Sequence, residues 1–356
     1  MPLEGNGKIS FERKYVVAPD NYDDFRFGGE TVRNLTEEIS TMLEYFSKYY
    51  TEEQLMENMK KYNLENMFDL VKKYFIKEFK YVGDGIELSS CYQNMLSCYI
   101  HDDEERPVFI HVDELFESTV MAFLLGMFKW SKDFDDSEVY GSCFKYILYI
   151  LNDVCIFGEM QEVNANQFIL NVVKDDVQIL QLAEDCYWTI IVFMLAHETA
   201  HVYLTSLGDS SMKEQPQREE FCADKIAYHI VLKIIMEEQM LLKEYTYLAP
   251  MMFMDFMDLI YYTDKVLYNT EFVEEKHPAP VKRKEQLFEV VNQDEYDFDT
   301  VDGNHLYGGF CDVYDEYRIQ VSLKTERGKL DRIIHTERRM KMKGKVEYEQ
   351  KGSTGI

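Results

Sequence analysis

The amino-acid sequence predicts a mainly α-helical protein of the α+β class that contains one small β-sheet. Apolar residues recur at three- and four-residue spacing along most of the chain, which is the helical period. One short segment, 106–116, is instead rich in β-branched and aromatic residues behind a proline. Of the 356 residues, 46% are hydrophobic and only seven are proline, so we expect a sizeable core and few long loops.

The first hundred residues are predicted to be mainly helical. Segments 31–50 and 52–80 both have amphipathic spacing, and the second helix is expected to break near Asn63. The segment DGIELSS, 84–90, begins with Asp-Gly and is expected to form a loop.

The middle of the chain is predicted to carry the sheet and a central helix. The run at 106–113 is expected to be an edge strand, because a proline precedes it, followed by a helix over 118–131. Another helix is expected over 138–157, and the segment 166–178 is expected to contribute a further short strand. Residues 178–206 are apolar nearly all round, which indicates a long buried helix.

A polar loop containing Gly208 and Pro216 follows, and three more helices are predicted after it, over 218–242, about 250–268 and 277–291.

We therefore divide the chain into an N-terminal helical region (1–104), a core (105–291) and a C-terminal extension (292–356).

The charge distribution argues against a nucleic-acid-binding protein. The formal net charge is -27, and a polyanion repels phosphates. The segment 321–345 holds nine basic against three acidic residues, but no aromatic residue that could stack on a base. We expect this segment to be a solvated helical tail or an arm that docks on the protein itself.

Other features favour a cytoplasmic protein that does not enter a membrane. The N-terminus lacks a basic region followed by an apolar run, so no secretory signal is expected. The longest apolar stretches, 120–128 and 189–196, are about half of a bilayer crossing. The seven cysteines are odd in number and scattered among apolar residues, as in reduced proteins. The sequence gives no indication of an oligomeric state.

The segment MLAHETAHVY, 194–203, contains an H-E-x-x-H pattern formed by His197, Glu198 and His201. Residues four apart on a helix project from one face about 6 Å apart, so both imidazoles can reach one zinc ion. Glu198 lies about 100° round the helix, where it can reach a water in an open coordination position. The alternative is a pair of hydrogen-bonded core histidines, but burying two His and a Glu together is costly without a cation.

A third ligand is expected from the segment EFCADKIA, 220–227. Glu220 and Asp224 are four apart, so one carboxylate can bind the metal while the other receives an N–H from a ligating histidine. Glu219 is the competing ligand, although it lies on a different side of the helix from Asp224. Taken alone, Glu220 could equally be a solvated acid at a helix N-terminus.

These segments, together with HPAPVKRKEQL at 277–287, resemble the ordered motifs of the gluzincin metallopeptidases. The pattern is similar to that of the prenyl-protein-protease and heat-shock-peptidase branch without its membrane helices, and to the phage-exclusion peptidase Lit. The resemblance covers about 105–290. It implies a zincin-like metallopeptidase core, with the small sheet beside the helix that carries the H-E-x-x-H pattern.

Carried over by position, the resemblance implies His197, His201 and Glu220 as Zn²⁺ ligands and Glu198 as the general base. Asp224 would orient a histidine, and His277 and Arg283 would support the site. The implied activity is hydrolysis of peptide bonds through a zinc-activated water, on a protein or peptide substrate, with a specific target in bacterial defence or regulation as the implied setting. The alternative is a zinc-containing, non-catalytic binding or regulatory protein built on the same scaffold.

The sequence leaves the group that stabilises the transition state open. Tyr203, Tyr228 and His229 are all near the motifs, and we expect His229 to be a packed core histidine instead. Cys222 is expected to be a small buried apolar residue rather than a ligand.

Overall fold

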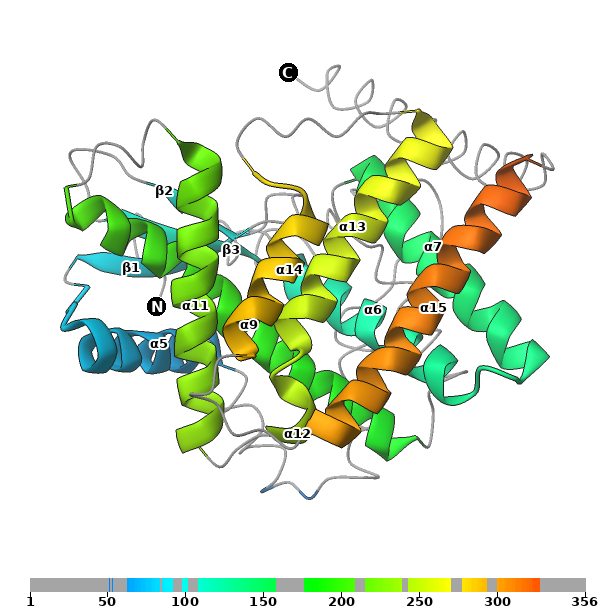
Figure 1. The fold of residues 1–356 in the computed structure, drawn as a ribbon, viewed down its shortest axis with the longest axis horizontal. Coiled ribbons are helices and arrows are strands. Elements are labelled where there is room, and N and C mark those ends of the chain that lie inside the picture. The colour runs from blue at the N-terminus through cyan, green and yellow to red at the C-terminus, as the bar shows by residue number, and fades with distance from the viewer. Residues whose placement is uncertain are drawn as a thin grey trace, which may run out of the picture.

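The computed structural model describes most of the chain from residue 63 onward. The described residues are 51, 53, 63–83, 85–91, 98–101, 108–157, 176–208, 215–238, 243–269, 277–292 and 300–326. They form nine helices and three strands: α5 (Leu64–Phe79), β1 (Ile86–Cys91), β2 (Cys98–His101), β3 (Val108–Asp113), α6 (Glu114–Lys132), α7 (Ser137–Phe157), α9 (Val177–Ser206), α11 (Pro216–Glu237), α12 (Lys243–Thr246), α13 (Ala249–Tyr268), α14 (Pro280–Val291) and α15 (Thr300–Glu326). The protein is therefore mainly helical with one small sheet, as predicted (Figure 1).

The helix α9 is the centre of the fold, and α11, α6, α13 and α5 all pack against it. Its side chains are buried on every side from Cys186 to Phe193, as the continuous apolar pattern predicted. Among the described helices, α9 is the one long and apolar enough to cross a membrane, and 78% of its most apolar window is buried inside the protein.

The three strands form a mixed sheet in the order β1-β3-β2, in which β3 pairs parallel with β1 and antiparallel with β2. The prediction of a strand at 106–113 is confirmed, but its assignment as an edge strand is wrong, because β3 is the central strand. The expected loop at 84–90 is also wrong, because β1 begins at Ile86. Ile86 is buried and pairs with Val108, so burial against β3 overrides a pattern too short to identify a strand.

The sheet lies beside the helix that carries His197. Both β2 and β3 contact α9, and Ile110 and Val112 of β3 enter the common core. The predicted position of the sheet is therefore confirmed.

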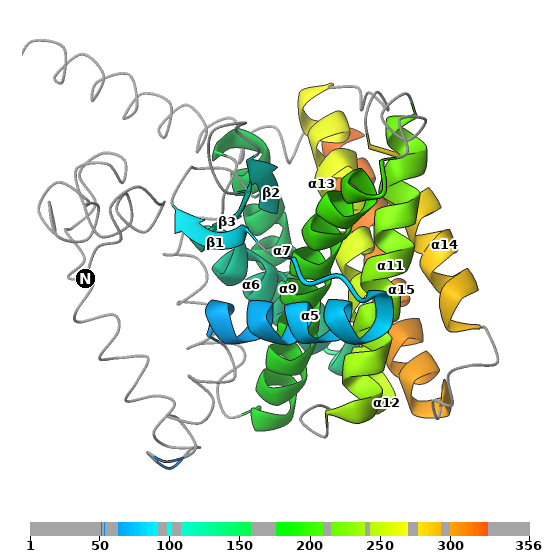
Figure 2. The same cartoon turned by 90° about the vertical axis from the view of Figure 1, so that its left-hand side faces the viewer.

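The helix α5 begins where the sequence predicted a break. The side chain of Asn63 caps it by accepting a hydrogen bond from the backbone N–H of Asn66 at 3.0 Å. From there α5 runs across α9 and α11 (Figure 2). The predicted helices before Asn63 lie almost entirely outside the described residues, as does most of the predicted strand at 166–178. Its last two residues, Val177 and Gln178, belong to α9 instead.

The C-terminal helices follow the predicted order with shifted ends. The helix α11 ends at Glu237, five residues before the predicted end, and α14 begins at Pro280, where proline suits the first helical turn. The helix α15 was not predicted. It packs on α6 and α13, and its residues Phe310, Tyr317 and Val321 are buried.

One hydrophobic core includes residues from all three predicted regions of the chain. Most of the basic segment 321–345 lies outside the described residues; Lys324, within α15, has its ammonium 3.7 Å from the ring centre of Phe144.

Candidate metal centre

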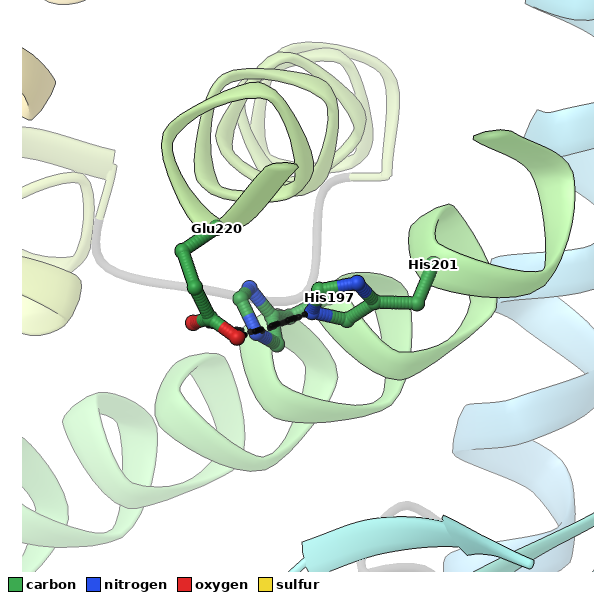
Figure 3. Close-up of side chains that lie close together, drawn as sticks. All are labelled: His197, His201 and Glu220. Atoms are coloured by element: carbon green, nitrogen blue, oxygen red, sulfur yellow. Dashed lines mark hydrogen bonds and ion pairs between the residues drawn. The ribbon is translucent and has the colours of Figure 1, made fainter. Parts of the chain in front are cut away.

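The candidate site lies where α9 packs against α11. His197 and His201 project from the same face of α9, one turn apart, and Glu220 reaches them from the first turns of α11 (Figure 3). The site is largely enclosed, with His197 4% exposed and Glu220 7% exposed. We call His197, His201 and Glu220 the metal cluster.

The geometry of the metal cluster suits a single ion. Nε2 of His197 lies 3.1 Å from Nε2 of His201, and the Glu220 carboxylate oxygens lie 3.4 Å from His201 Nε2 and 3.5 Å from His197 Nε2. Ligand atoms about 2.0–2.1 Å from a tetrahedral zinc ion stand about 3.3 Å from one another. One donor atom from each of the three residues falls within 4.8 Å of the others, so the group could hold a metal ion.

One oxygen of the cluster is not satisfied by the described part of the protein. Oε2 of Glu220 is buried and accepts no hydrogen bond from the described residues. Two histidine nitrogens that face each other can share at most one proton. Leaving such atoms unpaired in a core is costly, and a bound cation removes that cost.

Asp224 holds the outer side of His197. Its Oδ1 lies 3.0 Å from Nδ1 of His197. Asp224 is completely buried and is held in turn by Arg283, which donates from Nε at 2.7 Å and from Nη2 at 2.6 Å. The sequence predicted both residues near the site, and the structure brings both to it.

Glu219, which was considered as a competing metal ligand, contacts the outer side of His201 instead. Its Oε1 lies 2.9 Å from Nδ1 of His201, so Glu219 orients that histidine and is not a member of the metal cluster. Metal-binding histidines commonly donate their second N–H to a carboxylate. The sequence signal for this arrangement was the pair of adjacent glutamates, Glu219 and Glu220, near the start of α11. Glu220 faces the two histidines of the metal cluster, and Glu219 orients His201.

His277 lies at the outer edge of the site. Its Nδ1 is 3.1 Å from Oε1 of Glu220, and its side chain is 62% exposed. Nη2 of Arg283 is 3.7 Å from the other oxygen of Glu220. Both residues from the HPAPVKRKEQL segment therefore contact the site, as expected.

The carboxylates give the site a strong preference for positive charge. Burial lowers the pKa of His197, but Asp224 and Glu220 outweigh burial and raise that pKa to about 10. Burial raises the pKa of Glu220, yet His197, His201 and His277 together hold it well below its usual value. Burial likewise opposes ionisation of Asp224, but Arg283 lowers its pKa to about 2. A metal ligand must be a deprotonated imidazole nitrogen, so a bound cation would displace the proton that Asp224 and Glu220 favour on His197.

Glu198 is buried next to the metal cluster and has no hydrogen bond or ion pair with another described residue. It is 7% exposed, and burial raises the pKa of its carboxyl group while His197 and His201 lower it. A desolvated carboxylate without a protein partner is suited to accept a proton from water.

The other residues near the motifs have structural contacts of their own. The ring of Tyr203 packs between Phe79 and Tyr81, and the hydroxyl of Tyr228 donates to the carbonyl of Tyr247 at 2.8 Å. His229 packs against the ring of Phe79 and pairs with Glu78, so it is a packed histidine, although partly exposed.

Cys222 is a half-buried free thiol and is not part of the metal cluster.

Comparisons of the chain with models of protein families, with curated proteins and with solved structures found no match. The fold brings His197, His201 and Glu220 together, with Asp224, His277 and Arg283 in contact with them.

Proposed function

We propose that the protein is a zinc-dependent endopeptidase whose metal is held by His197, His201 and Glu220. The observation that supports this most is the metal cluster itself, three protein ligands at zinc spacing with Glu198 beside them. Two imidazoles and one carboxylate form a donor set typical of catalytic zinc. Structural zinc sites have four protein ligands, whereas only three are found among the described residues.

The residues of the chain divide the chemistry between them. Zinc, when bound, supplies a Lewis acid that polarises a carbonyl and makes water more acidic. Glu198 takes the proton from the attacking water and passes it to the amine that leaves. Asp224 and Glu219 hold His197 and His201 in orientation, and Arg283 balances the charge of Asp224.

The substrate we propose is a protein or peptide, cleaved in the cytoplasm. The sequence resemblance suggests a specific protein target in bacterial defence or regulation; this setting rests on analogy with that branch of peptidases.

The substitution Glu198→Gln tests the proposal, because it keeps the shape of the side chain and removes the base. Loss of a general base reduces the rate by about 10²–10⁴-fold or more. We expect proteolysis, measured as new peptide termini in a proteome-wide screen, to fall by at least that factor while zinc content by mass spectrometry stays at the wild-type level.

Glu184→Gln provides a matched control, since it makes the same substitution on α9 away from the metal cluster. We expect it to retain wild-type cleavage. The contradicting outcome concerns whatever effect expression of the protein has on the cell. If Glu198→Gln keeps that effect in full and His197→Ala loses it, zinc only stabilises a non-catalytic scaffold.

A further inference from the structure

The helix α14 lies between α11 and α13, and two adjacent residues on it form ion pairs on its two sides. Arg283 binds Asp224 of α11 at the metal site. Lys284 binds Asp255 of α13, with its Nζ 2.5 Å from Oδ1. Adjacent residues on a helix are about 100° apart round the axis, so the two ion pairs fix α14 from different directions.

The carboxylate of Asp255 connects α14 to a third helix. Asp255 is 1% exposed, and the hydroxyl of Tyr307 on α15 donates to its Oδ2 at 2.6 Å. The ring of Tyr307 also packs against Phe288 of α14, with 5.7 Å between the ring centres. The helices α13, α14 and α15 therefore meet at one buried carboxylate.

Apolar packing is a modest restraint on α14. Of its 12 residues Pro280, Leu287 and Val290 are buried, and Phe288 and Val291 are partly buried against the core. Arg283 must nevertheless present two nitrogens to Asp224, and a fork geometry of this kind tolerates little rotation of the helix. The contact of Lys284 with the buried Asp255 is a second polar restraint on α14, beside the contact that Arg283 makes at the site.

We propose that Lys284, Asp255 and Tyr307 are positioning residues for the metal centre. They hold α14 in the rotation at which Arg283 meets Asp224 and Glu220, and so they couple the C-terminal helix α15 to the site. This inference rests on the metal binding of the proposed function, and not on peptide hydrolysis.

A second network on the same helices provides a matched control. Asp258 of α13 accepts a hydrogen bond from the hydroxyl of Tyr314 on α15, and Nη1 of Arg318 lies 3.4 Å from the same carboxylate. This network joins α13 to α15, as Tyr307 does, but among the described residues its carboxylate has no hydrogen bond to α14. The centre of the Tyr314 ring lies 5.6 Å from Nζ of Lys284, and Tyr314→Phe retains that ring. Tyr307→Phe and Tyr314→Phe each remove one hydroxyl that donates to an aspartate of α13.

The experiment compares zinc affinity, measured by competition with a chromophoric chelator, in the full-length protein and four variants. Lys284→Met is expected to weaken zinc binding on the order of 10-fold, the lower end of the range for residues that support metal ligands. Tyr307→Phe is expected to weaken it less but measurably, Lys284→Arg to restore it, and Tyr314→Phe to leave it unchanged. Urea unfolding of each variant shows whether the two tyrosine variants lose similar stability.

The outcomes separate this inference from the proposed function. Wild-type protein that binds no zinc would overturn both. Zinc binding that is unchanged in Tyr307→Phe, or weakened equally in Tyr314→Phe, would overturn the positioning role alone. Because Lys284→Met leaves Asp255 buried without a cation, the tyrosine pair decides the question if that variant does not fold.

Discussion

Two groups of buried or half-buried polar residues connect the helices of this protein, and they differ in how their charges are satisfied. Where α13 meets α14 and α15, Asp255 is matched by Lys284 and Tyr307, and Asp258 by Arg318 and Tyr314. In the metal cluster, the two histidine nitrogens face each other 3.1 Å apart, and an oxygen of Glu220 has no hydrogen-bond partner among the described residues.

The difference shows which group needs something from outside the chain. A buried carboxylate that has a cation and a phenol as partners is complete, and it serves to join helices. A buried group in which a carboxylate oxygen lacks a donor and two imidazole nitrogens face each other is incomplete, and natural proteins tolerate such a group mainly at functional sites. The first group therefore predicts effects on stability, and the second predicts effects on metal binding.

The largest effect is expected from His201→Ala, which removes one of the three ligands. Wild-type protein should carry about one zinc per chain, as a catalytic site with one ion does. In the variant we expect zinc to be lost after dialysis, a larger effect than the 10–100-fold typical of supporting residues. Metal content by mass spectrometry measures this.

His229→Ala is the control for that prediction, because His229 is a histidine of the neighbouring helix that pairs with Glu78 outside the metal cluster. It should retain its zinc. Equal zinc loss in both variants would show that the fold, and not the ligand, had been disturbed.

A smaller effect is expected from Arg283→Met. Asp224 would then be buried without its cation, and breaking a buried ion pair costs about 3–5 kcal/mol of stability. Because Asp224 also holds His197, zinc affinity should fall by about 10–100-fold. Chelator competition and urea unfolding measure the two effects.

The zinc affinity and stability of Arg283→Lys should fall between those of Arg283→Met and the wild type, since an ammonium cannot make the two-nitrogen contact. Wild-type zinc affinity in Arg283→Met would contradict the role of this residue.

The sequence was sufficient to predict the parts of the site that depend on local geometry. His197 and His201 meet because they are four apart on one helix, and that spacing needs no tertiary information. The choice of Glu220 over Glu219 followed from its spacing to Asp224, and the structure places both carboxylates of that pair on His197. The role of Glu219 depends on how α11 is rotated against α9, which only packing determines.

Elements held by distant contacts could not be predicted in the same way. The strand β1 has six residues and depends on pairing with β3, and nothing in its own sequence distinguishes it from a loop. The helix α15 has a weak apolar pattern, with glycines at 308 and 309, and it is stabilised by contacts with α6 and α13. The pairing of Asp255 with Lys284 and Tyr307 joins residues 29 and 52 positions apart.

The smallest effect is expected from Arg318→Met. It is the same substitution as Arg283→Met, made in the network that joins α13 to α15 instead of at the metal site. Arg318 is 39% exposed and lies 3.4 Å from Asp258, whereas Arg283 is 15% exposed and contacts Asp224 at 2.6 Å. Exposed pairs contribute about 0–1 kcal/mol, and the hydroxyl of Tyr314 still reaches Asp258 in the variant. We therefore expect a loss of less than about 1 kcal/mol in the free energy of unfolding, reduced further by salt, and an unchanged affinity for zinc. Urea unfolding at low and high ionic strength and the same chelator competition measure both quantities.

The contradicting result would be a loss of zinc affinity in Arg318→Met as large as that in Arg283→Met. The Asp258 network and the metal site would then act as one unit, and the contrast between a complete and an incomplete group would no longer hold.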